Sequence, residues 1–112
     1  MTTAFADEVV MVKDLGHLSD GLIARATGAA PSTVRGWLAR KSSPTGVRAE
    51  RVAELSALVS RLMRVMNADY IPVWLTKPIE ALDDEKPLDL LARGDYRLVS
   101  SAVRNLEHPG AV

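Results

Sequence analysis

The chain has 112 residues and a formal net charge of zero, with 14 Lys and Arg residues against 14 Asp and Glu residues. This balance argues against indiscriminate binding to nucleic acid, and the absence of cysteine excludes disulfides and thiolate metal sites. Neither a basic-then-apolar leader nor an apolar run long enough to span a bilayer is present, so we expect a cytoplasmic protein without a membrane partner.

The sequence favours an all-α fold, because 47% of the residues are hydrophobic, only 4% are aromatic, and no strand pattern of useful length is present. The apolar spacing over residues 4–18 allows a first helix. Residues 20–39 then predict two short helices joined by a tight turn. Ser19 can cap the first of these, Gly28 can end it, and Pro31 suits the first turn of the second.

The spacing from Ala24 to Gly28 to Val34 is typical of DNA-binding helix-turn-helix units. Val34, Trp37 and Leu38 fall on one face of the second helix, which we expect to pack on the first. An ordinary helical hairpin has the same local features, so that alternative stays open.

The opposite face of the second helix is a candidate for contact with operator DNA. Gly36 and Ala39 should face outward there, and the residues that we assign to DNA contact are Ser32, Thr33, Arg35, Arg40 and Lys41. Arg35 can reach a base edge or a phosphate, and the hydroxyls at the helix start can bind a phosphate beside backbone N–H groups. Because one such unit neutralises few phosphates, useful affinity requires at least two copies, and we expect a homodimer or a higher hetero-oligomer with a protein partner.

Residues 41–46, KSSPTG, predict a loop, and residues 47–67 predict the longest helix. Its apolar positions recur at spacings of three and four: Val52, Leu55, Val59, Leu62 and Met66. Further apolar residues widen this surface, which indicates burial on two sides, either inside the chain's own core or against another subunit. Charged residues take the remaining surface of the helix: Glu50, Arg51, Glu54, Arg61 and Arg64.

The remainder of the chain predicts short helices separated by prolines. We expect Asp69 to cap a brief helix that stops near Pro78, a turn at 79–82, a helix at 87–92, and a last helix at 96–106 capped by Asp95. The acidic residues 83–85 have no histidine or cysteine nearby in sequence, which favours a solvated loop. No phosphate-binding loop, paired histidines or nucleophile elbow is present, so we expect neither an enzyme nor a metal or cofactor site.

Residues 74–91, WLTKPIEALDDEKPLDLL, combine a Trp-Leu pair, a proline-led turn, a leucine and a Pro-Leu-Asp-Leu-Leu run before a final helix. This order resembles the C-terminal toxin-binding domain of the MbcA/ParS/Xre antitoxin family. The resemblance implies an Xre-like helix-turn-helix domain at 1–46, a connecting or dimerisation helix at 47–68, and a toxin-binding domain at 69–112. It also implies a type II antitoxin that neutralises a RES-domain toxin. Such a toxin consumes NAD or transfers ADP-ribose, and the complex of antitoxin and toxin represses the operon that encodes them.

Carried over by position, the toxin-binding candidates are Arg104, Glu107, Pro109, Gly110, Ala111 and Val112. The resemblance implies that Trp74, Leu75, Pro87 and Leu91 build the domain instead. Two features depart from the family pattern: His108 and Pro109 separate Glu107 from Gly110, and Ala30 stands where a serine cap is common. The alternative function is a helix-turn-helix repressor whose C-terminal helices serve dimerisation or sensing, without a toxin partner.

Overall fold

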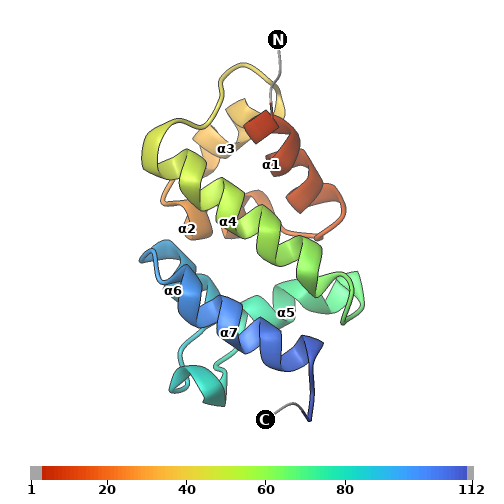
Figure 1. Ribbon diagram of the computed structural model, residues 1–112. Helices are drawn as coiled ribbons and strands as arrows, with labels where there is room; N and C mark the ends of the chain where they lie inside the picture. The colour runs from red at the N-terminus through yellow and green to blue at the C-terminus, as the bar shows by residue number, and fades with distance from the viewer. Residues whose placement is uncertain (1–3, 111–112) are drawn as a thin grey trace.

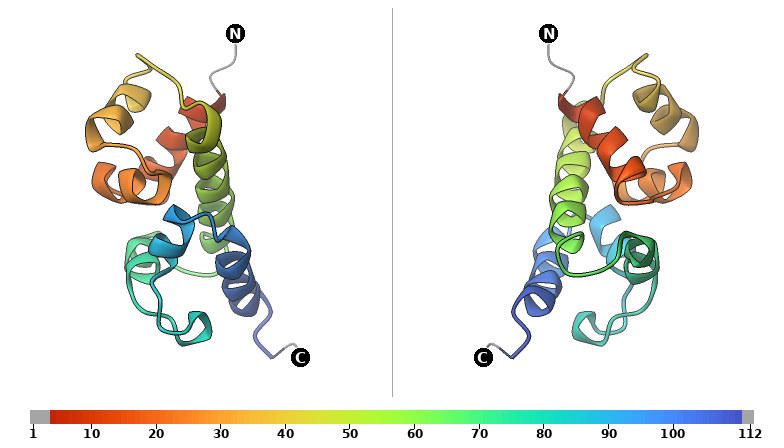
Figure 2. Two further views of the ribbon diagram at one scale, coloured as in Figure 1. Left: turned by 90° about the vertical axis from the view of Figure 1, so that its left-hand side faces the viewer. Right: turned by 90° about the vertical axis from the view of Figure 1, so that its right-hand side faces the viewer.

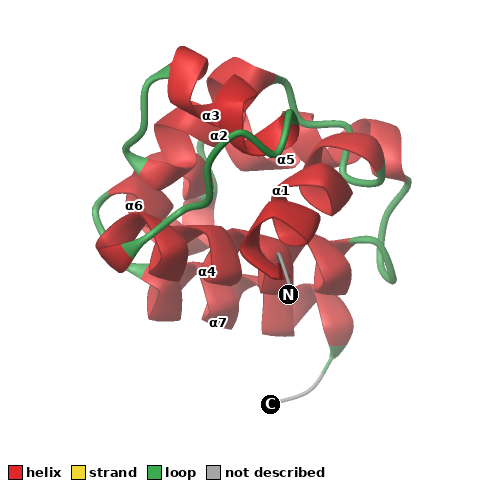
Figure 3. Ribbon diagram, turned by 90° about the horizontal axis from the view of Figure 1, so that it is seen from above, coloured by secondary structure: helices red, strands yellow, loops and turns green. Residues whose placement is uncertain are grey.

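The computed structural model describes residues 4–110, and over that range it contains helices and connecting loops without a β-strand (Figure 3). The helices in chain order are α1 (Ala4–Asp14), α2 (Asp20–Thr27), α3 (Pro31–Leu38), α4 (Gly46–Leu62), the 3₁₀ turn η1 (Ala68–Tyr70), α5 (Ile71–Thr76), the 3₁₀ turn η2 (Glu80–Leu82), α6 (Pro87–Ala92) and α7 (Tyr96–Glu107). The all-α prediction is confirmed for these residues.

Helix α4 is the axis of an elongated molecule that measures 45 × 24 × 22 Å. Helices α1, α2 and α3 lie in one half and α5, α6 and α7 in the other, with α4 running between them (Figures 1 and 2). Helix α4 packs against α1 and α2 and also against α6 and α7. Its buried apolar residues are Val52, Leu55, Leu58, Val59 and Leu62. Packing within one chain therefore buries these five residues, whereas Met63 and Val65, just beyond the end of the helix, are 38% and 37% exposed.

The connection between α2 and α3 follows local sequence signals. The Oγ of Ser19 accepts a hydrogen bond from the amide of Leu22 at 3.1 Å, and Gly28 ends α2 with a φ of 76°. Both caps and Pro31 at the start of α3 confirm the prediction for this turn. Val34 and Trp37 are buried, as the helical period predicts, and fix α3 against the core.

Two of the helices are shorter than predicted. Helix α1 ends at Asp14 instead of continuing to residue 18, and His17 takes a left-handed φ of 59° in the turn that follows. Helix α4 ends at Leu62 instead of residue 67. The Leu62 carbonyl accepts hydrogen bonds from the amides of Val65 and Met66, which form a tight turn directly after the helix. This turn sends the chain back along the molecule, which lets Ile71 reach the core.

Two capping predictions are wrong. Asn67, not Asp69, caps η1, because its Oδ1 accepts the amide of Asp69 at 2.9 Å. Asp95 precedes α7 but makes no capping bond, since its backbone angles of −89° and 48° lie outside the extended region usual for a cap. Both positions lie in short connections whose geometry depends on the elements packed around them.

Helix α6 has the predicted bounds, and its PLDLLA sequence places Pro87, Leu88, Leu90 and Leu91 inside the core. Trp74 and Leu75 of α5 are also buried, which agrees with the expectation that they build the domain. Helix α6 packs on α2, and Arg25 donates to Asp89 at 2.8 Å between them. The core is therefore continuous from α1 to α7. Between residues 4 and 110, no helix is both long enough and apolar enough to cross a bilayer.

Candidate functional site

The C-terminal half of α7 is the first candidate site, because it carries the chain out of the core. Val99, Ala102 and Val103 are buried against the rest of the protein. The next three residues, Arg104, Asn105 and Leu106, are all exposed. The last helical turn therefore leaves the apolar core while it still has helical geometry.

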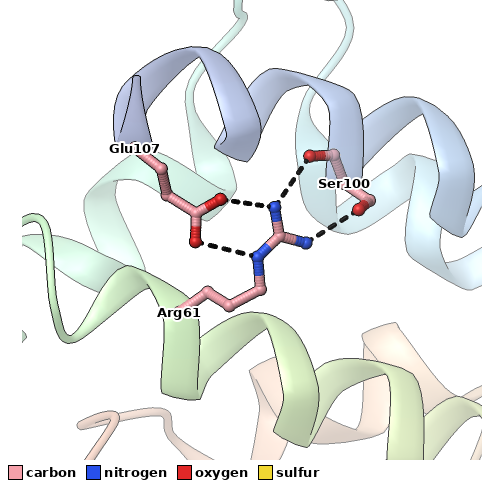
Figure 4. Close-up of polar contacts among 3 residues, drawn as sticks. All are labelled: Arg61, Ser100 and Glu107. Atoms are coloured by element: carbon pink, nitrogen blue, oxygen red, sulfur yellow. Dashed lines mark hydrogen bonds and ion pairs between the residues drawn. The ribbon is translucent and has the colours of Figure 1, made fainter. Parts of the chain in front are cut away.

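One arginine holds this turn against α4. The guanidinium of Arg61 donates from Nε to Oε2 of Glu107 at 3.0 Å and from Nη2 to Oε1 at 2.8 Å (Figure 4). The same group donates from Nη1 to the hydroxyl of Ser100 at 2.7 Å and from Nη2 to the Ser100 carbonyl at 3.2 Å. The side chains of Arg61 and Glu107 are 19% and 21% exposed, so the contact is half-buried. We call these three residues the Arg61 clamp.

The clamp shifts the pKa of both charged members in the direction that keeps them ionised. The hydrogen bond to Glu107 raises the pKa of the Arg61 guanidinium. The hydrogen bond from Arg61, together with its positive charge, holds the pKa of the Glu107 carboxyl below its ordinary value of 4.5. At neutral pH the clamp is therefore a charged, bidentate pair, the stronger kind of side-chain hydrogen bond.

Residues 108–112 follow α7 and are called the tail below; the structure describes 108–110. The amide of His108 still donates to the Arg104 carbonyl at 2.9 Å, which closes the helix. Residues 108–110 are exposed, and Gly110 takes a φ of 91°, a conformation that favours glycine. Of the predicted toxin-binding residues, Ala111 and Val112 lie outside the described residues.

The predicted toxin-binding residues therefore do not share one environment. Arg104, Pro109 and Gly110 are exposed, whereas the carboxylate of Glu107 already binds Arg61 within the chain. The sequence interpretation placed Arg61 on the part of the long helix that apolar residues leave, and it assigned this arginine no partner, whereas the structure pairs it with Glu107. Ser100 and Glu107 are seven positions apart, two helical turns on one side of α7, but nothing in the sequence identifies their partner 39 and 46 residues earlier.

The outer face of α3 is the second candidate site. Ser32 and Arg35 are exposed, and Thr33 is half-buried at the helix start. Ala30 precedes α3 in an extended conformation and provides no side-chain cap, as its residue type predicts. At the start of this eight-residue helix Pro31 has no N–H and the amide of Thr33 donates to the Ala30 carbonyl at 3.0 Å, so the exposed polar groups of this face are the side chains of Ser32 and Arg35.

The residues after α3 are arranged differently from the prediction. Arg40 lies in a left-handed turn with a φ of 59° and pairs with Asp7 of α1 at 2.6 Å. Lys41 is exposed, and its amide donates to the Gly36 carbonyl at 2.9 Å. The loop consequently covers Gly36, where an added Cβ would lie 3.1 Å from the Ser42 Oγ. Gly36 was expected to face outward, and its partial burial corrects that expectation.

The two candidate sites lie in opposite halves of the molecule, α3 near one end and the end of α7 near the other (Figure 2). Among residues 4–110, no group of three or more His, Cys, Asp or Glu side chains is arranged to hold a metal ion. The exposed features of both sites are hydrogen-bonding and charged groups on helix ends. Such groups are suited to contact with a macromolecule.

No protein-family model matches the chain. The mycobacterial cidal antitoxin MbcA of Mycobacterium tuberculosis (strain ATCC 25618 / H37Rv) is 31% identical over 75 residues, 67% of this chain and 66% of that protein. MbcA of Mycobacterium bovis has the same identity and coverage. The chain thus spans just under two thirds of the length of these curated relatives. A chain in the crystal structure of the M. tuberculosis MbcT–MbcA toxin–antitoxin complex matches with a TM-score of 0.84 and 25% identity, over 96% of each chain.

Proposed function

The chain belongs to the family of the mycobacterial cidal antitoxin MbcA, and from this premise we propose that it is an antitoxin that binds and neutralises a toxin protein. The observation that carries the proposal is the agreement in fold over 96% of the chain with a chain of a toxin–antitoxin complex. That coverage extends beyond α1–α4 into the half of the molecule that contains α5, α6 and α7. A fold match confined to the N-terminal helices would have fitted a plain repressor equally well.

We propose further that the toxin has a RES domain and either consumes NAD or transfers ADP-ribose. In this proposal the end of α7 and the tail contact the toxin and close its active-site cleft in the cytoplasm. The exposure of Arg104, Pro109 and Gly110 beyond the last buried residue of α7, Val103, supports this assignment. Trp74 and Leu75 are buried and unavailable for such contact.

The test is rescue of a host that expresses a candidate RES-domain toxin from the same genome. A stop codon after His108 removes residues 109–112 but keeps Glu107 and therefore the Arg61 clamp, unlike a stop after Leu106. The shortened chain should melt at the same temperature as the full chain and fail to protect the host. Full protection by the shortened chain would refute the assignment of the tail.

A second function, repression of its own operon, is proposed for the outer face of α3. The observation in its favour is the exposure of Ser32 and Arg35 at the start and middle of α3, with Lys41 exposed beyond its end. We propose that two or more copies bind the operator together, because one copy offers few phosphate contacts. The alternative, a repressor without a toxin partner, shares this face but not the contact at the tail.

Binding to the promoter fragment, measured by fluorescence anisotropy at several salt concentrations, tests this second function. Arg35→Ala should weaken binding, whereas Arg97→Ala, at an exposed position on α7, should leave it unchanged. Under the alternative, Arg35→Ala removes all function and the wild-type chain never rescues toxin-expressing cells. Identical affinities for the wild type and Arg35→Ala would refute the assignment of α3.

A further inference from the structure

We propose that Arg61 is a positioning residue for toxin binding: its clamp on Ser100 and Glu107 fixes the last turn of α7 and so sets the direction in which the tail meets the toxin. This inference rests on the proposed antitoxin function and goes beyond it. It moves Glu107 from the residues that contact the toxin to the residues that hold the site in place. Arg61, which lies on α4, then acts on toxin binding without touching the toxin.

The last turn of α7 has few apolar contacts that would hold it against the core. Val103 is fully buried, but Arg104 and Asn105 are exposed, and Leu106 leaves 38% of its surface exposed. Helix ends without tertiary packing fray, because the last carbonyls have no partners within the helix. Something other than core burial must hold residues 104–107 in helical geometry.

Ser100 and Glu107 are two turns apart on the same side of α7, and a single guanidinium donates two hydrogen bonds to each of them. The bond to the Ser100 carbonyl binds the helix backbone as well as its side chains (Figure 4). The planar fork of arginine makes this set of bonds, whereas a lysine ammonium provides only a point charge.

Residues 108–110 are exposed and do not belong to the hydrophobic core, so their path begins where the last turn of α7 places His108. A tail that is already aligned loses less conformational freedom when it binds than one whose helix end frays. The clamp therefore raises affinity by pre-organising the tail and adds no contact with the toxin.

The test compares the wild-type chain with Arg61→Ala and with Glu107→Gln, which keeps the size of the side chain but removes its charge. The matched control is Arg93→Ala, which also removes an arginine bound to both oxygens of a glutamate, here Glu85 at 2.9 Å, away from the end of α7. Three quantities are measured for each chain: amide hydrogen exchange without toxin, melting temperature, and affinity for a candidate RES-domain toxin from the same genome.

In Arg61→Ala, amide exchange at residues 104–108 should accelerate by about tenfold or more, while exchange in the core of α4 stays near the wild-type rate. Toxin affinity should fall by roughly tenfold, Glu107→Gln should show a smaller change in the same direction, and Arg93→Ala should match the wild type. A purely structural role would instead accelerate exchange throughout the chain in step with a lower melting temperature.

Any of three results would overturn the inference while leaving the antitoxin function intact. One is unchanged exchange at residues 104–108 in Arg61→Ala, and a second is equal toxin affinity for wild type and Arg61→Ala. Exchange that accelerates through the core of α4 as much as at the end of α7 would also overturn it. If the wild-type chain itself fails to bind the toxin, the proposed function falls and this inference falls with it.

Discussion

Replacing Gly16 with alanine should destabilise the protein, because the turn after α1 lies in direct contact with α4. An added Cβ would lie 2.6 Å from the Val12 carbonyl oxygen and 2.7 Å from Cγ1 of Val59. Favourable contacts between carbon atoms begin near 3.5 Å, so the methyl group would overlap a backbone atom on one side and a buried side chain on the other. Gly16 does not have a positive φ, so the effect comes from space and not from backbone strain.

Overpacking of this kind costs about 1–3 kcal/mol. Because alanine also reduces the freedom of the unfolded chain by about 0.4–1 kcal/mol, the net loss should lie in the lower part of that range. A loss of ~1–2 kcal/mol corresponds to a fall in melting temperature of roughly 4–8 °C for a domain of this size. Thermal and urea unfolding followed by circular dichroism measure both quantities.

Gly21 provides the matched control. It lies in α2, and an added Cβ there would meet no heavy atom closer than the Ser19 Oγ at 3.9 Å. Gly21→Ala should therefore stabilise the protein by about 0.4–1 kcal/mol through helix propensity and the entropy of the unfolded chain. If Gly16→Ala melts at or above the wild-type temperature, the close approach of the α1 turn to α4 is refuted.

Two further predictions concern the clamp and the start of α3. Arg61 lowers the pKa of the Glu107 carboxyl in the folded state. The carboxylate therefore stabilises the fold fully at pH values above its ordinary pKa of 4.5, and this stabilisation is lost as the pH falls from 4.5 through the lowered pKa of the folded state. The difference in unfolding free energy between wild type and Glu107→Gln should consequently shrink from pH 7 to pH 3, and a constant difference would contradict the charged pairing. Ala30→Ser should raise stability by about 0.5–2 kcal/mol. Ala30 already has the extended backbone angles of a capping residue, and a serine hydroxyl at this position can accept a hydrogen bond from an amide in the first turn of α3. A lower melting temperature for Ala30→Ser would contradict the capping geometry at α3.

Local signals predicted the short elements well. Pro87 sets the start of α6 with a fixed φ and no N–H, and Ser19 and Gly28 bound α2 through bonds that span three or four residues. The capping residues and the proline act within one helical turn, so the helix ends that they set can be predicted from the sequence. Helix α4 shows the limit, because residues 63–66 contain no helix breaker and the helix still ends at Leu62. That end follows from the burial of Ile71 and α5, which only the folded chain specifies.

The candidate site was predictable only in part for the same reason. The amphipathic pattern of α7 separates the buried Val99 and Val103 from the exposed Arg104, and this follows from the helical period. The pairing of Arg61 with Glu107 spans 46 residues and depends on how α4 lies beside α7. Charge type and spacing alone placed Arg61 on the polar surface of the helix, and tertiary packing brought Ser100 and Glu107 to it.

Direct titration of a candidate RES-domain toxin from the same genome with the full chain, followed by calorimetry and by NAD turnover, tests the proposal that the chain is an antitoxin. We expect saturable binding at submicromolar concentrations, about −8 kcal/mol or stronger, and loss of NAD turnover at the same saturation point. A chain that is folded but neither binds the toxin nor slows its reaction would contradict the account.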